Sequence, residues 1–340
     1  MSTAMPTLRD LGEFEVLRRL AAARRPPAGT LLDAGDDAAI LRPAAGSDLV
    51  VTTDAFVEGR HFLPDWFAAS DVGARLAVAN LSDLAAMAAR PRWALLSMGV
   101  RSQHDVDELI SLQENVAATL GRHNAGLVGG NLTAVEGAEW FSLALIGEAA
   151  SGRAWTRSGA RPGDLLAVSG WPGRAGAGAR LAAALGVPEA GTESMVLLEA
   201  WFRPMDRVRF ASALAEAGGV TAAIDISDGL SGDLARLCEA SRVGAEILEA
   251  TWPDALLEQA ASRLGVRLAE LRYGPSDDYE LLLSVDPRAR DAVATVASEQ
   301  DVRLTFIGTF TDEPGILTAR DRGGRSGALP ASGYDHFGGS

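Results

Sequence analysis

Aspartates recur at the ends of hydrophobic runs and beside Gly, Ser or Thr, and these residues could form one functional site. Five stretches carry them: GDDAA (35–39), TTDAF (52–56), NLSDLAAM (80–87), DISDGL (225–230) and SDDYEL (276–281). Several carboxylates with little His or Cys form the oxygen-rich ligand set that Mg²⁺ prefers. Mg²⁺ ions can bridge phosphate oxygens and neutralise charge during phosphoryl transfer. Such a reaction needs no protein nucleophile, so we expect no covalent intermediate.

Each of these stretches also has a purely structural interpretation. Asp beside Gly is common in turns, where its side chain accepts a backbone hydrogen bond, and this applies to GDDAA and SDDYEL. In DISDGL, Ser227 or Asp228 could cap the helix that follows. The same helix start could instead present N–H groups to a phosphate, with Asp225 free to hold a cation beside it.

Asp83 lies in an Ala- and Leu-rich stretch that predicts a helix over 71–89. Asn80 precedes it by three residues, so both side chains fall on one helical face. A carboxylate among apolar residues is costly unless it is paired or bound to a metal. An exposed polar stripe is the alternative, and the sequence leaves both open.

Three further features are weaker signals. His61 closely follows TTDAFVEGR and could face the same site, although a single His is more often structural. Arg157 lies in a connector and could hold a phosphate, whereas an ordinary surface Arg is the simpler interpretation. The glycine-rich stretch 170–178 follows a predicted strand, as a phosphate loop would, but it lacks the spacing of a dinucleotide fingerprint.

Alternating strands and helices must position these residues. Hydrophobic periodicity predicts strands at 48–53, 93–100, 140–149, 165–170, 221–227, 279–285 and 302–310. It predicts helices at 8–23, 71–89, 104–123, 174–186, 229–240 and 287–299. The pattern indicates an α/β (α+β) fold in two domains, 1–150 and 151–340, with a connector of Gly, Ser, Arg and Pro at the boundary.

Composition narrows the class of protein. The 340 residues are 47% hydrophobic and carry a net charge of −14, which argues against binding to nucleic acid or to an anionic membrane. Lys is absent, so phosphate chemistry cannot use a Walker-type Lys. Cys238 is the only cysteine, which excludes an internal disulfide. No run approaches about 18 apolar residues, so we expect no membrane span and a cytoplasmic protein.

Taken in order, the motifs resemble the thiamine-monophosphate kinase family. That family belongs to a superfamily with aminoimidazole ribonucleotide synthetase and selenophosphate synthetase. The matching stretches are GDDAA (35–39), TTDAFVEGRHF (52–62), NLSDLAAMAARP (80–91), GGNLT (129–133), TRSGARPGD (156–164), DISDGLSGDL (225–234), SDDYEL (276–281) and GYDHF (333–337). They cover almost the whole chain. TTDAFVEGRHF and NLSDLAAMAARP are specific to the family, whereas DISDGL is shared with the superfamily.

The resemblance implies ATP-dependent phosphorylation of thiamine monophosphate to thiamine diphosphate by direct in-line transfer. It implies an N-terminal domain that binds ATP and several Mg²⁺ ions and pairs in a homodimer, and a C-terminal domain that completes the active-site cleft. Carried over by motif, the magnesium ligands would be Asp37, Thr52, Thr53, Asp54, Asp83, Asn131, Asp225 and Asp228. The ATP contacts would be Gly130, Asn131, Arg157 and Ser227. The thiamine contacts would be His61, Asp277 and Tyr334.

Two positions depart from the family pattern. Asn131 stands where the family often has Asp, so it offers a metal only a neutral amide oxygen. Asp277 stands where the family usually has Glu and is one methylene shorter. Two alternatives stay open: a related ATP-dependent synthetase resembling aminoimidazole ribonucleotide synthetase, and a nucleotide-binding protein without catalysis. Selenophosphate synthetase is disfavoured because no Cys lies near the N-terminus.

Overall fold

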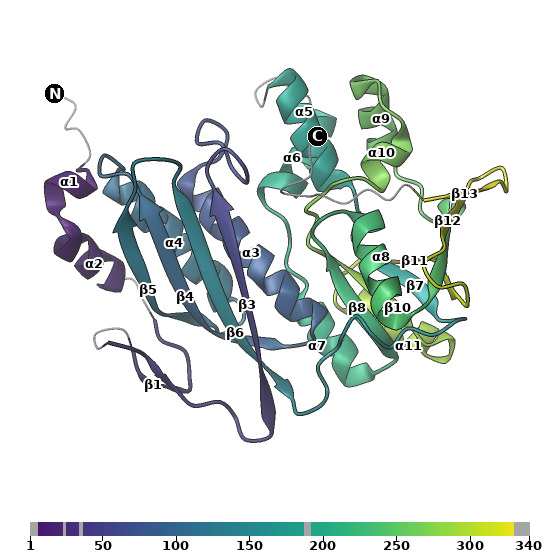
Figure 1. Ribbon diagram of the computed structural model, residues 1–340, viewed down its shortest axis with the longest axis horizontal. Coiled ribbons are helices and arrows are strands. Elements are labelled where there is room, and N and C mark those ends of the chain that lie inside the picture. The colour runs from purple at the N-terminus through teal and green to yellow at the C-terminus, as the bar shows by residue number, and fades with distance from the viewer. Residues whose placement is uncertain (1–5, 23–24, 34–36, 187–191, 330–340) are drawn as a thin grey trace. The chain divides into compact units, whose positions relative to one another are not determined.

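The computed structural model describes residues 6–22, 25–33, 37–186 and 192–329 (Figure 1). The chain divides into two compact units. Unit 1 comprises Met1–Leu84 and Ala89–Arg153, and unit 2 comprises Ala85–Ala88 and Ala154–Ser340. Among the described residues, no helix is long and apolar enough to cross a membrane.

Unit 1 is built on a four-stranded sheet of order β3-β6-β4-β5. Its strands are β3 (Ser47–Val57), β4 (Arg90–Val100), β5 (Gly126–Ala134) and β6 (Trp140–Ala150). Only β4 and β5 pair in parallel. The elements before β3 are the short helices α1 (Leu8–Leu11) and α2 (Glu13–Ala22) and the strand pair β1 (Thr30–Leu32) and β2 (Ile40–Leu41).

Helices α3 (Ala69–Ala86) and α4 (Val106–Gly121) cover one face of this sheet (Figure 1). The two helices pack closely at Gly73, where an added Cβ would lie 2.2 Å from the carbonyl oxygen of Leu112. The opposite face of β3 is open: the side chains of Leu49 and Val51 are 52% and 65% exposed. The sheet therefore has one face packed against helices and one apolar face turned to solvent.

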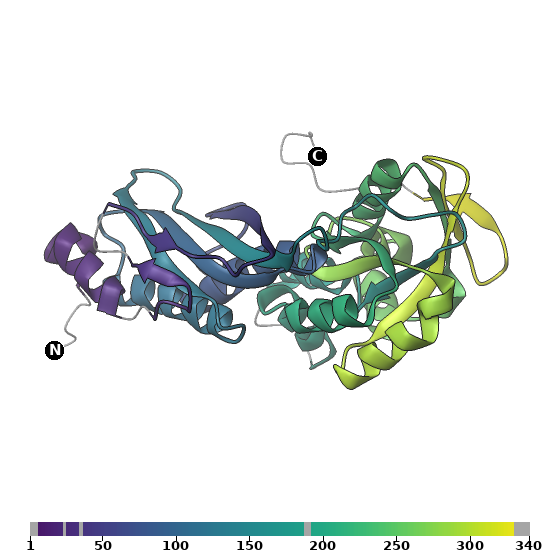
Figure 2. The same ribbon diagram turned by 90° about the horizontal axis from the view of Figure 1, so that it is seen from below.

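Unit 2 is built on a seven-stranded sheet of order β13-β12-β9-β11-β7-β10-β8. Figure 2 shows the strands and helices of this unit in teal, green and yellow. Its strands are β7 (Leu165–Ser169), β8 (Val220–Ile226), β9 (Gly244–Leu248), β10 (Glu280–Val285), β11 (Leu304–Thr311), β12 (Leu317–Arg320) and β13 (Ser326–Ala328). Its helices are α5 (Arg174–Leu185), α6 (Thr192–Phe202), α7 (Val208–Ala217), α8 (Leu230–Ser241), α9 (Ala255–Leu264), α10 (Leu268–Arg272) and α11 (Arg290–Glu299), with short 3-10 turns at Glu249–Thr251 and Pro287–Ala289.

Two buried clusters hold unit 2 together. In the larger one, Leu234 and Leu237 of α8 pack with Ile224 and Ile226 of β8, so the helix is held against the strand that precedes it. The smaller cluster joins α5, α9 and α10 to α6 through apolar side chains such as Leu181, Leu197, Leu257 and Leu271. The loop between β8 and α8 is thereby fixed at both ends.

The α/β (α+β) fold class is confirmed, with differences in detail. The predicted single helix over 8–23 is wrong, because the chain breaks at Gly12, whose φ is 74°, into α1 and α2. The helix predicted over 71–89 is α3, which begins two residues earlier and stops at Ala86, and Pro91 lies inside β4. Periodicity did not indicate the short or apolar elements β1, β2, α6, α7, β9, α9, α10, β12 and β13.

Candidate functional site

A hydrogen bond to an acidic side chain joins β3 to the end of α3 in unit 1. Thr52 Oγ1 donates a hydrogen bond to Asp83 Oδ2. One turn earlier on α3, Asn80 is fully buried, and its Nδ2 donates to the carbonyl oxygen of Leu76 at 3.0 Å. Asn80 Oδ1 has no hydrogen-bond partner among the described residues. The structure therefore brings together Thr52 and Asp83 and places an amide acceptor one helical turn away.

Side-chain alternation along β3 separates two neighbouring predicted ligands. Thr52 and Asp54 are two apart, so their side chains lie on one face of the strand, and Thr53 lies on the other. The structure agrees, because Thr53 Oγ1 lies 3.5 Å from Ser142 Oγ of β6, and Thr53 is more exposed than either neighbour. Thr53 could share a cation with Thr52 and Asp54 only through its backbone carbonyl.

Gly130 and Asn131 lie on the opposite edge of the same sheet. Asp54 pairs with Leu143, Leu143 pairs with Leu96, and Leu96 pairs with Gly130. Two strands thus lie between Asp54 and Gly130, a separation of about 14 Å at the usual spacing of neighbouring strands. Within one chain, Asn131 cannot share a cation with Asp54.

The DISDG loop, residues 225–229, joins β8 to α8 and carries the acidic motif of unit 2. Gly229 is the N-cap of α8 and makes no side-chain cap. The interpretation of Ser227 or Asp228 as helix cap is therefore wrong. The backbone N–H groups of Ser227 and Asp228 each donate to Oδ2 of Asp233 at 3.0 Å. Burial raises the pKa of the Asp233 carboxyl, and those hydrogen bonds oppose the shift.

Asp233 and its partner Arg236 were missed by sequence reasoning. Arg236 Nη1 donates to Asp233 Oδ1 at 2.6 Å and to Asp228 Oδ2 at 2.5 Å. Asp233 lies four residues after Gly229, and an acidic residue in the first turn of a helix is the one available signal. The loop's N–H groups, expected to face a phosphate, are bonded instead to this buried carboxylate.

The remaining predicted residues are spread over both units. Asp225 is 3% exposed at the end of β8. His61 is held locally, because its Nδ1 accepts the N–H of Val57 at 3.1 Å and its ring stacks on Phe56. Asp37 and Arg157 are exposed, and Asp277 is half-buried. Tyr334 lies outside the described residues.

The donors fit Mg²⁺ in type. They are carboxylate, hydroxyl and amide oxygens, and Mg²⁺ usually takes one or two carboxylates and completes its shell with water and substrate phosphates. Among the residues that the structure describes, no three His, Cys, Asp or Glu side chains lie close enough to hold a metal by themselves. The oxygen donors occur in smaller groups, such as Thr52 with Asp83.

The glycine-rich stretch 170–178 is not a phosphate loop. Its N–H donors at the start of α5 are taken by side chains that follow about a hundred residues later. Gly173 and Ala175 donate to the two carboxylate oxygens of Asp278 at 2.7 and 3.0 Å, and Gly176 donates to Ser276 Oγ at 2.8 Å. The second acid of SDDYEL is therefore a helix-capping residue.

Asp278 should make stability depend on pH in an unusual direction. Burial raises the pKa of its carboxyl to about 6, against an ordinary value of 3.8. The folded state then holds a proton that the unfolded state has lost, so the stabilisation belongs to low pH and disappears as the pH rises through 6. We expect the difference in unfolding free energy between wild type and Asp278→Asn to fall by about 1 kcal/mol from pH 5 to pH 7.

Urea unfolding at a series of pH values measures this difference. Asp286→Asn is the matched control, because Arg288 holds the pKa of the half-buried Asp286 carboxyl down at about 2 and no titration of that group falls between pH 5 and pH 7. A difference for Asp278→Asn that stays flat between pH 5 and pH 7 would contradict the assignment.

A pocket of about 520 Å³ lies beside the start of α5 and is lined mostly by α6 and the α6–α7 connection. On its lining, Arg207 and Glu280 form a two-contact ion pair at 2.5 Å, and Ser169 Oγ also donates to Glu280. Gly170 makes room for this carboxylate, since an added Cβ would lie 1.7 Å from Glu280 Oε1. The acid and the base neutralise each other, which makes this pair a structural feature of the pocket.

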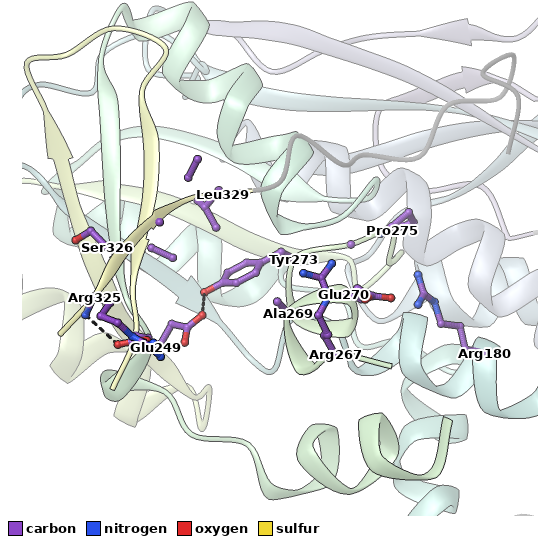
Figure 3. A pocket seen from close by; sticks show the side chains of 15 residues that line it. Arg180, Glu249, Arg267, Ala269, Glu270, Tyr273, Pro275, Arg325, Ser326 and Leu329 are labelled. Atoms are coloured by element: carbon purple, nitrogen blue, oxygen red, sulfur yellow. Dashed lines mark hydrogen bonds and ion pairs between the residues drawn. The ribbon is translucent and has the colours of Figure 1, made fainter. Parts of the chain in front are cut away.

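A larger pocket of about 720 Å³ lies against α10 and the β12–β13 hairpin (Figure 3). Its acids and bases are largely paired with one another. Arg267 pairs with Glu270 at 2.8 Å, and Tyr273 donates its hydroxyl to Glu249 at 2.9 Å. Among the described residues, none of those predicted as magnesium ligands, ATP contacts or thiamine contacts lines either pocket, although Asp278 of SDDYEL lines the smaller one.

Comparison with known proteins shows to which family this chain is related. Residues 35–149 match the AIR synthase related protein, N-terminal domain, and residues 161–319 match the AIR synthase related protein, C-terminal domain. A thiamine-monophosphate kinase from Escherichia coli O157:H7 is 37% identical over 333 residues, which cover 96% of this chain and 98% of the relative. One from Mycobacterium tuberculosis strain H37Rv is 36% identical over 269 residues, 78% of each chain.

Solved structures support the same family relationship. The crystal structure of thiamine-monophosphate kinase from Stenotrophomonas maltophilia K279a has a TM-score of 0.79 and 33% identity, and covers 92% of this chain and 97% of its own. AaThiL complexed with AMPPCP and TMP has a TM-score of 0.74 and 25% identity, and covers 98% and 100%. With these relatives and both domain matches, the chain belongs to the thiamine-monophosphate kinase family of AIR synthase related proteins.

Proposed function

We propose that this chain transfers the γ-phosphoryl group of ATP directly to the phosphate of thiamine monophosphate and forms thiamine diphosphate and ADP. The observation that carries the proposal is the 37% identity to a thiamine-monophosphate kinase over 96% of the chain. AaThiL, whose fold this chain shares, binds TMP together with AMPPCP, a non-hydrolysable analogue of ATP. An ordered set of acidic motifs alone would leave the acceptor open.

We propose that Mg²⁺ ions are required and that oxygen atoms in the acidic motifs of each unit are ligands for such ions. Unit 1 would contribute Asp37, Thr52, Asp54 and Asp83, with the backbone carbonyl of Thr53. Unit 2 would contribute Asp225 and Asp228. Mg²⁺ supplies charge neutralisation for the phosphate oxygens. Gly130, Arg157 and Ser227 as ATP contacts, and His61, Asp277 and Tyr334 as thiamine contacts, stay predictions.

A coupled assay for ADP release tests the function. Purified full-length protein with ATP, MgCl₂ and thiamine monophosphate should turn over, and chromatography should find thiamine diphosphate in amounts equal to ADP. Thiamine, which lacks the acceptor phosphate, is the matched control substrate and should give none. Excess EDTA should stop the reaction. A folded protein that binds ATP and releases no ADP with thiamine monophosphate would overturn the proposal.

We also propose that two copies pair through the open face of the unit 1 sheet. Large apolar side chains on that face are exposed, and exposed apolar patches of this kind mark interaction sites. Asn131 lies too far from Asp54 to serve the same cation within one chain, so its roles as a metal ligand and as an ATP contact stay predictions. The cytoplasmic location expected from the sequence stays a prediction.

Val51→Asp should separate the two copies. Val51 is 65% exposed on the open face, and a buried unpaired carboxylate would weaken association by about a hundredfold or more. Light scattering on the size-exclusion eluate should give about twice the chain mass of 35.5 kDa for wild type and about the chain mass for the variant. Val196→Asp on α6, where Val196 is 47% exposed, is the control and should stay dimeric. A monomeric wild type at micromolar concentration would contradict the proposal.

A further inference from the structure

The DISDG loop is held in place by a carboxylate and a guanidinium that belong to α8. The Asp233 side chain is 1% exposed, and the Arg236 side chain is 40% exposed. One Asp233 oxygen accepts two consecutive backbone N–H groups of the loop, at 3.0 Å each. Its other oxygen accepts Arg236 Nη1 at 2.6 Å. The carboxylate therefore ties the loop backbone to the first turn of the helix.

Arg236 connects this buried carboxylate to the partly exposed Asp228. The same Nη1 atom that contacts Asp233 donates to Asp228 Oδ2 at 2.5 Å. A guanidinium at this distance forms a charge-assisted hydrogen bond and fixes the carboxylate in one orientation. It also places a positive charge against one of the two Asp228 oxygens that a metal ion could use.

We propose that Asp233 and Arg236 are positioning residues with opposite effects on cation binding at Asp228. Asp233 holds the loop in shape and adds negative charge behind it, and so favours the cation. Arg236 is hydrogen-bonded to the Asp228 carboxylate and repels the cation. It therefore raises the metal concentration that is needed to fill the site. The inference rests on the proposed function, in which Asp228 is a magnesium ligand.

Substitutions of the two residues should change the Mn²⁺ affinity in opposite directions. Arg236→Gln keeps a hydrogen-bond donor and removes the charge, so Mn²⁺ should bind about three to ten times more tightly. Asp233→Asn removes the charge behind the loop and the pairing with Arg236, so Mn²⁺ should bind about five times more weakly or worse. Arg236→Lys keeps the charge and should stay close to wild type. General damage to the loop would weaken binding in all three variants.

The probe is Mn²⁺ alone, titrated into the full-length protein and followed by the electron paramagnetic resonance signal of the free ion. Arg242→Gln, at the other end of α8, makes the same charge change on an exposed side chain and should have wild-type affinity. The Mg²⁺ concentration for half-maximal turnover should shift in the same order as the Mn²⁺ affinities. Thermal unfolding of each variant reports whether the fold survives.

The two proposals fail separately. If wild type phosphorylates thiamine monophosphate but Arg236→Gln binds Mn²⁺ no more tightly than wild type, the inference on Arg236 is wrong and the function stands. If Asp233→Asn binds Mn²⁺ as wild type does, the role of Asp233 is wrong. If wild type shows no turnover with thiamine monophosphate, the proposed function fails, and the order of Mn²⁺ affinities still decides the role of both residues.

Discussion

Replacing Asp83 with Asn should lower turnover of thiamine monophosphate by about a thousandfold and leave the fold intact. The amide has the shape of the carboxylate and can still accept the hydrogen bond of Thr52 through its oxygen. What it loses is the negative charge that a divalent cation needs, at a place where Thr52 and Asn80 already supply neutral oxygens. The expected defect is therefore in catalysis and metal use, with little change in stability.

The measurement is the rate of ADP release at saturating ATP and thiamine monophosphate over a range of Mg²⁺ concentrations, together with a thermal melt. Asp71→Asn is the matched control. Asp71 lies in the first turn of α3 and, like Asp83 near the end of that helix, is half-buried. It should keep turnover within about twofold of wild type. An Asp83→Asn variant with wild-type turnover would remove Asp83 from the proposed ligand set.

The sequence predicted the local setting of the acidic motifs well, because that setting follows from nearby residues. The Ala- and Leu-rich run around Asp83 does form a helix, and DISDGL does join a strand to a helix. Alternation along β3 also places Thr53 on the opposite face from Thr52 and Asp54, whereas the predicted ligand set grouped all three. Such features depend on spacing within about ten residues, and spacing is what a sequence displays directly.

Long-range arrangement could not be predicted in the same way. Nothing near GGNLT indicates that two strands lie between it and TTDAF, because the sheet order β3-β6-β4-β5 is set by packing of the whole unit. The glycine-rich stretch looked like a phosphate loop because its acceptor, Asp278, lies about a hundred residues away. Asp233 was not predicted because a sequence does not show whether an acid in the first turn of a helix is buried.

Replacing Gly229 with Ala should both destabilise the protein, by about 3 kcal/mol or more, and abolish turnover. Gly229 has a φ of 108°, a region that residues with a side chain rarely adopt. An added Cβ would lie 2.1 Å from the carbonyl oxygen of Gly274, and 3.2 Å from Cα of Pro275. Because these atoms belong to the backbone, the DISDG loop and the segment at 274–275 would have to move apart.

That movement would act directly on the site, since Ser227 and Asp228 precede Gly229 and are tied to the first turn of α8. Urea unfolding and the ADP-release assay measure the two effects. Gly265→Ala separates conformational strain from the clash, because Gly265 has a φ of 66° and no atom within 4 Å of an added Cβ. We expect Gly265→Ala to cost about 1 kcal/mol and to leave turnover unchanged. If Gly229→Ala costs no more than Gly265→Ala, the close approach of the two segments does not hold the loop in place.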